Sequence, residues 1–146
     1  MSEPKQVIII RTDTEPKMRK GKMIAQGSHA SMKAILDSME HQSYKRRGVP
    51  NPDKYPEGKW LHPANYTEKT LKLVCTPETP LTEWLEGLFT KVVVKGTLDE
   101  ISHAYNEAKN NGMICSLITD KGLTEFGGKE TVTAAAIGPD YHDKID

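Results

Sequence analysis

The chain has 146 residues and a mass of 16.3 kDa, 36% of its residues are hydrophobic and 27% charged, and its formal net charge is zero. These values fit one soluble globular domain and exclude a disordered or membrane-embedded chain. The aliphatic run from Val7 to Ile10 is too short to span a bilayer, and the opening SEPKQ lacks the form of a secretory signal, so we expect a cytoplasmic protein. Cys75 and Cys115 are isolated and lack the spacing of zinc ligands, so the sequence suggests neither a zinc site nor a disulfide framework. We expect reduced thiols, and we expect no cofactor.

The charges are unevenly divided along the chain. The first 47 residues hold ten Lys and Arg against five Asp and Glu, and the remainder holds ten against fifteen. Basic residues crowd the approach to the first expected helix at Lys17, Arg19, Lys20 and Lys22. Phosphate groups favour such a surface, although solvated charges around a helix give the same pattern.

The first half of the chain predicts a strand, a helix and an irregular block. Lys5 to Arg11 is a short run rich in β-branched residues and predicts a buried strand. Residues from about Gly21 to His41, rich in Ala, Met, Lys and Leu, predict a helix. The block from Gln42 to Pro80 contains many prolines and a possible small strand at Leu71 to Cys75, so we interpret it as an insertion.

The second half alternates strands with helices. Leu81 to Leu88 predicts a short helix, and Thr90 to Lys95 predicts a second buried strand. Thr97, with Asp99 or Glu100 after it, forms a capping pattern ahead of an amphipathic helix that ends near Gly112.

Two further strands complete the expected sheet, at Met113 to Thr119 and at Thr131 to Ile137. A loop of about a dozen residues between them favours an antiparallel edge. We therefore expect a single α/β domain over residues 1–146, with helices on a four-stranded, mixed and mainly parallel sheet in two or three layers.

The first helix has a polar stripe. At about 100° per residue, one narrow face holds Lys22, Gln26, His29 and Lys33. Beside it lie residues that allow close packing on the sheet, namely Met23, Gly27, Ala30 and Ala34, and further round lie four that we expect in the core, Ile24, Met32, Ile35 and Leu36. The polar stripe is either an exposed face or part of a functional site.

The segment GKMIAQGSHA at residues 21–30 resembles the GKxxAQxxHA signature of the archaeal and eukaryotic type of peptidyl-tRNA hydrolase, the second structural class of that enzyme. Three further segments agree in the same order: VIIIRTD with the first strand of the family, DKGLT at 120–124 with its DAGxT motif, and TAAAIGP at 133–139 with its TVLxIGP ending.

The resemblance implies an α/β enzyme, usually a homodimer, that cleaves the ester between a peptide and the terminal ribose of tRNA and so recycles stalled peptidyl-tRNA. It implies no metal. Lys22, Gln26, His29, Asp120, Thr124 and Thr133 match polar residues around the proposed site of the family.

Each matched residue has an expected role in the hydrolysis. We expect Asp120 to act on water, Lys22 to stabilise the oxyanion or a phosphate, and His29 to assist proton transfer or contact the ribose. The remaining residues would bind substrate, with Gln26, Thr124 and Thr133 positioning it and Lys17, Arg19 and Lys20 holding RNA phosphates.

Several alternatives stay open. Asp120, two residues before Gly122, is equally typical of a turn, and Thr131 competes with Thr133 for the family position. Lys121 stands where the family usually has alanine. The second hypothesis for function is a non-catalytic RNA-binding or protein-interaction module on the same scaffold.

Overall fold

A computed structural model describes residues 3–41, 45–46, 67–68, 71–122 and 126–145. The chain divides into two compact units, one formed by Met1–Ser38 with Cys75–Asp146 and the other by Met39–Val74. The single domain expected over residues 1–146 stays a prediction, and most of the expected insertion at 42–80 lies outside the described residues.

The unit Met39–Val74 contains two short antiparallel strand pairs in its described part. Strand β2 (Glu40–His41) pairs with β5 (Leu71–Lys72), and β3 (Lys45–Arg46) pairs with β4 (Thr67–Glu68). Strand β5 confirms the small strand that the sequence predicts in this region.

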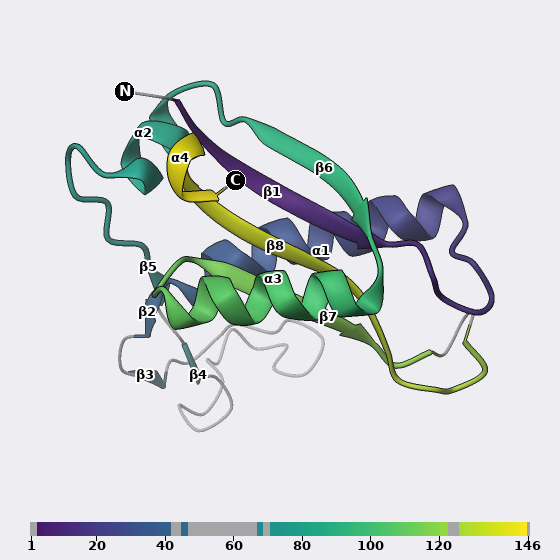
Figure 1. Cartoon of the computed structure of the whole chain (residues 1–146). Coiled ribbons are helices and arrows are strands. Elements are labelled where there is room, and N and C mark those ends of the chain that lie inside the picture. The colour runs from purple at the N-terminus through teal and green to yellow at the C-terminus, as the bar shows by residue number, and fades with distance from the viewer. Residues whose placement is uncertain (1–2, 42–44, 47–66, 69–70, 123–125, 146) are drawn as a thin grey trace, which may run out of the picture. The chain divides into compact units, whose positions relative to one another are not determined.

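The larger unit is built on a four-stranded sheet with the strand order β6, β1, β8, β7 (Figure 1). The strands are β1 (Pro4–Arg11), β6 (Lys91–Gly96), β7 (Cys115–Asp120) and β8 (Thr131–Tyr141). Strands β1 and β6 run parallel, whereas β8 is antiparallel to both of its neighbours, β1 and β7. The expected α/β fold with a mixed sheet is confirmed.

The expectation of a mainly parallel sheet is wrong, because only one of the three pairings is parallel. The antiparallel β7–β8 edge that the short connection predicts is confirmed. Strand β8 then lies between β7 and β1, which makes a second pairing antiparallel.

In the described part of the chain, four helices accompany the sheet: α1 (Lys20–Asp37), α2 (Pro80–Glu86), α3 (Leu98–Asn110) and α4 (His142–Ile145). Helix α1 ends before the expected His41, since the Ser38 amide donates to the carbonyls of Ile35 and Leu36 and β2 begins at Glu40. Among the described residues, no helix combines the length and the apolar character needed to cross a membrane.

Helix α3 covers one face of the sheet through an apolar cluster. Ile101 and Ala108 are buried against Ile9, Ala135 and Ile137. The helix begins as the sequence predicts, because Thr97 accepts a hydrogen bond from the Glu100 amide while the Glu100 carboxylate accepts one from the Thr97 amide.

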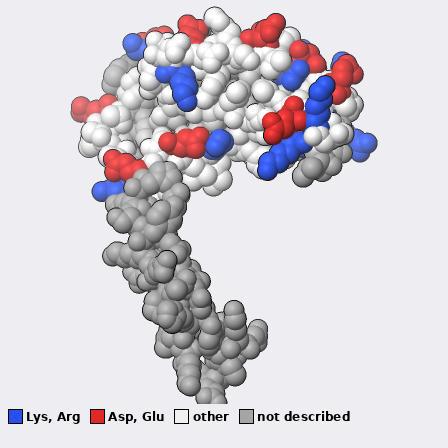
Figure 2. All heavy atoms as spheres, turned by 90° about the horizontal axis from the view of Figure 1, so that it is seen from below, with Lys and Arg blue, Asp and Glu red and all other residues white. Residues whose placement is uncertain are grey.

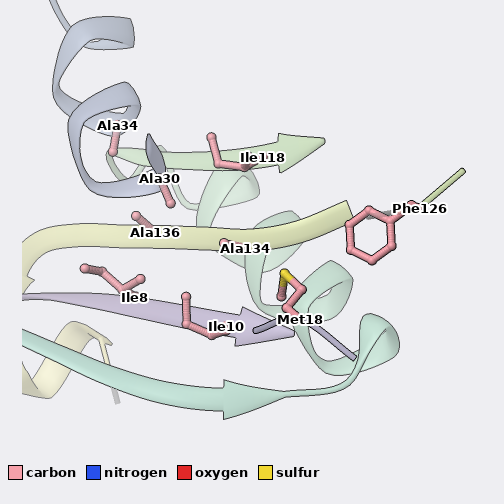
Figure 3. Packing of buried hydrophobic residues seen from close by; sticks show 9 residues of the cluster. All are labelled: Ile8, Ile10, Met18, Ala30, Ala34, Ile118, Phe126, Ala134 and Ala136. Atoms are coloured by element: carbon pink, nitrogen blue, oxygen red, sulfur yellow. The ribbon is translucent and has the colours of Figure 1, made fainter. Parts of the chain in front are cut away.

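Helix α1 covers the opposite face and gives the unit three layers (Figure 1). Its contact with the sheet uses small side chains, as Figure 3 shows for Ala30 and Ala34 above Ile8, Ile10 and Ala136. A Cβ on Gly27 would meet Ile10 Cδ1 at 3.1 Å, so glycine permits this close approach.

The expectation that Ile24, Met32, Ile35 and Leu36 form core is wrong. Ile24 is 70% exposed, Met32 66% and Leu36 38%, and Ile35 is only half-buried. Helix α1 instead buries its small and polar face, which comprises Gln26, Gly27, Ala30, Ser31 and Ala34.

Buried hydrogen bonds compensate for the polar groups beneath α1. Ser31 Oγ donates to Gln6 Oε1 on β1 at 2.5 Å, and Ser116 Oγ on β7 donates to the Ala30 carbonyl at 2.6 Å. Because a buried polar group costs free energy unless it is paired, these bonds fix the place of α1 on the sheet.

Strand β6 departs from the sequence prediction of a buried strand. It lies at the sheet edge, and Val92, Val93 and Val94 are all exposed, with Val93 at 63%. Val93 pairs with Ile8, whose side chain packs in the α1 cluster, so Val93 lies on the α1 side of the sheet.

Candidate active site

Lys22 and Asp120 form an ion pair between the first turn of α1 and the last residue of β7. Lys22 Nζ lies 3.0 Å from Asp120 Oδ2, and the side chains are only 14% and 19% exposed. Helix α1 has no acidic residue in its first turn, where the helix dipole disfavours a lysine. The carboxylate of Asp120 therefore supplies the negative charge that stabilises Lys22 there.

The backbone after Asp120 holds the carboxylate in place. The Gly122 amide donates to Asp120 Oδ2 at 3.1 Å, so this oxygen accepts hydrogen bonds from both Gly122 and Lys22. Gly122 has a φ of +76°, and a Cβ there would lie 2.2 Å from the Lys129 carbonyl oxygen. Only glycine fits this turn. The turn and the ion pair occur together, so the two interpretations of Asp120 are compatible.

Phe126 adds an apolar wall to the pair. It is 7% exposed and packs in the α1 cluster (Figure 3), and Lys22 Nζ lies 5.9 Å from the centre of its ring. Sequence reasoning missed Phe126, because an aromatic residue in a glycine-containing loop has no periodic pattern that predicts its burial.

Gln26 and Thr133 form a second contact between α1 and the sheet, one turn along the helix from Lys22. Thr133 Oγ1 on β8 donates to Gln26 Oε1 at 2.5 Å, and both residues are buried. Thr131 bonds instead to the carbonyl of Lys129, within the loop that precedes the strand. Thr133 is therefore the threonine that lies against the polar stripe of α1.

His29 lies on the exposed side of α1. Within the part of the chain that the structure describes, no hydrogen bond or ion pair joins His29 to Lys22 or Asp120. The structure thus brings the lysine and the carboxylate together and leaves the imidazole in solvent. Lys33, on the same stripe, pairs with Asp37 at 3.5 Å.

The basic residues Lys17, Arg19 and Lys20 are exposed just before and at the start of α1. Figure 2 shows Lys and Arg interspersed with Asp and Glu on the face that it presents, so that face is not uniformly basic. Thr124, a candidate substrate-binding residue, lies outside the described residues.

The ion pair of Lys22 and Asp120 suits acid–base chemistry. The described residues contain no group of three or more His, Cys, Asp or Glu side chains arranged to hold a metal ion. A lysine ammonium beside a carboxylate in a partly desolvated site can place positive charge near a developing oxyanion and accept a proton from water.

A family model and several individual proteins match nearly the whole of this chain and carry the same name. Residues 4–146 match the family model described as "Peptidyl-tRNA hydrolase PTH2". A protein named peptidyl-tRNA hydrolase from Methanocaldococcus jannaschii is 36% identical over 143 residues, covering 97% of this chain and 91% of the relative. Proteins of the same name from Methanothermobacter thermautotrophicus and Staphylothermus marinus are each 32% identical, over 97% and 99% of this chain and 91% and 89% of the relatives.

Proposed function

Because this chain belongs to the PTH2 family of peptidyl-tRNA hydrolases, we propose that the ion pair between Lys22 and Asp120 carries out the hydrolysis of peptidyl-tRNA. The chain is an enzyme that cleaves the ester between a peptide and the terminal ribose of tRNA. The alternative of a non-catalytic binding module is not favoured, since the relatives are named as hydrolases.

The observation that carries the proposal is the contact of Lys22 Nζ with Asp120 Oδ2. Lys22 and Gly122 both donate to Oδ2, so Oδ1 is the oxygen that we assign to the attacking water. Asp120 takes a proton from this water as its oxygen bonds to the ester carbonyl carbon. The resulting oxyanion lies against the Lys22 ammonium.

Collapse of the tetrahedral intermediate breaks the bond between the carbonyl carbon and the ribose oxygen. The proton held by Asp120 passes to that ribose oxygen, which leaves as a hydroxyl, and the peptide is released as a carboxylic acid. The proton taken from water thus ends on the ribose hydroxyl, and this sequence of steps uses no metal or other cofactor.

The other candidate residues bind and orient the substrate. Gln26, held by Thr133, positions the terminal nucleotide, together with Thr124. Exposed His29 contacts the ribose at the rim of the site, and Lys17, Arg19 and Lys20 bind tRNA phosphates.

We also propose that the enzyme is a cytoplasmic homodimer that acts in translation by recycling stalled peptidyl-tRNA. Cys75 and Cys115 are free thiols, which supports a reducing compartment. The apolar groups that α1 leaves exposed support association with another chain.

A peptide-release assay on peptidyl-tRNA tests the site. We expect Asp120→Asn and Lys22→Ala each to lower kcat/KM by about 100-fold or more, since each removes a group that acts in the transition state. His29→Ala should have a smaller effect, mainly on KM. Full turnover by Asp120→Asn would remove the carboxylate from this scheme.

Two matched controls separate the site from general charge effects. Lys33→Ala changes an exposed lysine on the same helix stripe, and Asp99→Asn changes an exposed aspartate in the first turn of α3. Both should keep nearly full turnover. A parallel tRNA-binding measurement distinguishes a failed reaction from failed binding.

A further inference from the structure

Strand β6 leaves one edge of the sheet without a neighbour (Figure 1). It is the outermost strand in the order β6, β1, β8, β7, and no other strand in the described part of the chain pairs with its outer side. The carbonyls of Thr90 and Gly96 accept hydrogen bonds from amides on β1 and directly after it. Because the groups that face a parallel neighbour alternate along a strand, the residues between, Lys91, Val93 and Lys95, direct their amides and carbonyls outward.

This edge is apolar as well as unpaired. Val92, Val93 and Val94 are all exposed, so the helices on the two faces of the sheet leave β6 open. Leu88 and Phe89, just before the strand, are exposed too. An exposed hydrophobic edge is a template on which an extended chain can add as a further strand, since it offers both main-chain hydrogen bonds and apolar area.

Two lysines flank the central valine on one face of this edge. Lys91, Val93 and Lys95 lie on the face of the sheet that α1 covers, and both lysines are exposed. Lys91 Nζ lies 3.3 Å from the centre of the Phe89 ring and 5.2 Å from that of Trp84. Among the described residues, no ion pair joins Lys91 or Lys95 to an acidic side chain. Partial burial lowers the pKa of Lys91, so an anionic neighbour would stabilise its charged form.

These charges disfavour a second copy of β6 as the added strand. In an antiparallel pair centred on Val93, Lys91 would lie opposite Lys95 of the second copy, and in a parallel pair in register each lysine would lie opposite its equivalent. Like charges directly opposite each other destabilise a strand pair, and lysines at a sheet edge prevent the pairing of identical chains in this way. A strand with carboxylates at the two matching positions turns both contacts into attractions.

We propose that the β6 edge binds an extended acidic segment of another protein, which adds to the sheet as a further strand. The segment has Glu or Asp opposite Lys91 and Lys95 and three apolar residues between them. The middle apolar side chain packs beside Val93, and the other two pack beside Val92 and Val94 on the opposite face. Main-chain hydrogen bonds supply affinity, and the two carboxylates select the partner.

Fluorescence anisotropy of a labelled peptide of sequence SEVVVES, titrated with the full-length chain, tests the proposal. The peptide carries two glutamates four residues apart with three valines between them, and the control peptide SKVVVKS has lysines in their place. The wild type should bind the acidic peptide at least about tenfold more tightly than the basic one, because two attractive contacts replace two repulsive ones.

The variant Val93→Pro tests the main-chain hydrogen bonds. It removes an amide that faces outward and none that bonds to β1, so the sheet should keep its pairing. Binding of SEVVVES should fall by about tenfold or more. The matched control Val93→Thr keeps the amide and should bind nearly as the wild type does. Circular dichroism and a thermal transition show whether each variant is folded.

Reversal of the lysines tests the charge contacts without touching the backbone. The double variant Lys91→Glu with Lys95→Glu should prefer SKVVVKS to SEVVVES. A control with the same change in net charge is Lys109→Glu with Lys144→Glu, at exposed lysines of α3 and α4. This control should keep the wild-type preference, because its charges lie away from the β6 edge.

Three results would overturn the proposal: no binding of SEVVVES up to millimolar protein, equal binding of the two peptides by the wild type, or a preference that the reversal at Lys91 and Lys95 leaves unchanged. Self-association of the wild type that Val93→Pro abolishes would also overturn it, because the occupant would then be a second copy. Two strands separate β6 from β7, which carries Asp120, so folded variants of the edge should release peptide from peptidyl-tRNA at the wild-type rate.

Discussion

The two helices that cover opposite faces of the sheet bury different kinds of residue. Helix α3 buries Ile101 and Ala108 and exposes its charges, as a helix of a soluble protein usually does. Helix α1 buries Gln26 and Ser31 and exposes Ile24 and Met32. The difference shows that α3 is positioned by apolar packing, whereas α1 is positioned by small side chains and hydrogen bonds.

Of these two helices, α1 carries residues of the proposed site, whereas α3 serves the stability of the fold. Among the polar groups that α1 places against the sheet, Lys22 contacts Asp120 and Gln26 contacts Thr133. An apolar helix face could not carry such groups without leaving them unpaired. Helix α3, by contrast, contributes no residue to the proposed site.

Truncation of Ile101 should give the largest loss of stability. The side chain is 0% exposed at the centre of the α3 contact, so Ile101→Ala should lower the free energy of unfolding by about 2–5 kcal/mol. Urea denaturation measures the loss, and kcat/KM of the folded variant should stay near wild type. Leu88→Ala, at a residue 77% exposed, should change stability by no more than about 0.5 kcal/mol. Equal losses in the two variants would contradict the account of α3.

The hydrogen bond between Thr133 and Gln26 should also contribute to stability. Thr133→Val removes the hydroxyl that donates to Gln26 and leaves a buried amide oxygen unpaired, so the free energy of unfolding should fall by about 1–3 kcal/mol. The double variant with Gln26→Leu should recover part of this loss, because both polar partners are then gone. Losses that simply add would show that the hydrogen bond does not hold α1 in place.

Sequence alone predicts the α3 side better than the α1 side. The capping pattern at Thr97 and the apolar period after it specify α3, and the structure has both. For α1 the same rule, that apolar residues face the core, puts Ile24 and Met32 on the wrong side. The rule fails because Gly27 and Ala30 allow a close contact that polar residues then complete.

The site was only partly visible in the sequence. Helical spacing places Lys22 and Gln26 on one stripe, but their partners Asp120 and Thr133 are distant in sequence, and only the resemblance to the family motifs points to them. The burial of Phe126 depends on how the loop after Asp120 turns back at Gly122, which no local pattern specifies. Long-range contacts of this kind need the folded chain.

The smallest predicted effect concerns Tyr141 at the end of β8. Its hydroxyl donates to Glu83 Oε2 on α2 at 2.6 Å, and this hydrogen bond raises the pKa of Tyr141 from 10.0 to about 12. A raised pKa means that the stabilisation is present below pH 10 and is lost as the pH rises toward 12.

Thermal transitions measured across that window should show the effect. Tyr141→Phe should lower the transition temperature slightly at pH 8 and should lose less stability than wild type between pH 10 and 12. Identical pH profiles for the two proteins would show that the contact contributes nothing to stability.

A double-mutant cycle on kcat/KM for peptide release from peptidyl-tRNA most directly tests the pairing of Lys22 with Asp120. The cycle compares wild type, Lys22→Ala, Asp120→Asn and the double variant. If the two side chains act as one unit, the double variant should be about as impaired as the worse single variant. Effects that multiply independently, or turnover that survives the loss of either side chain, would contradict the account.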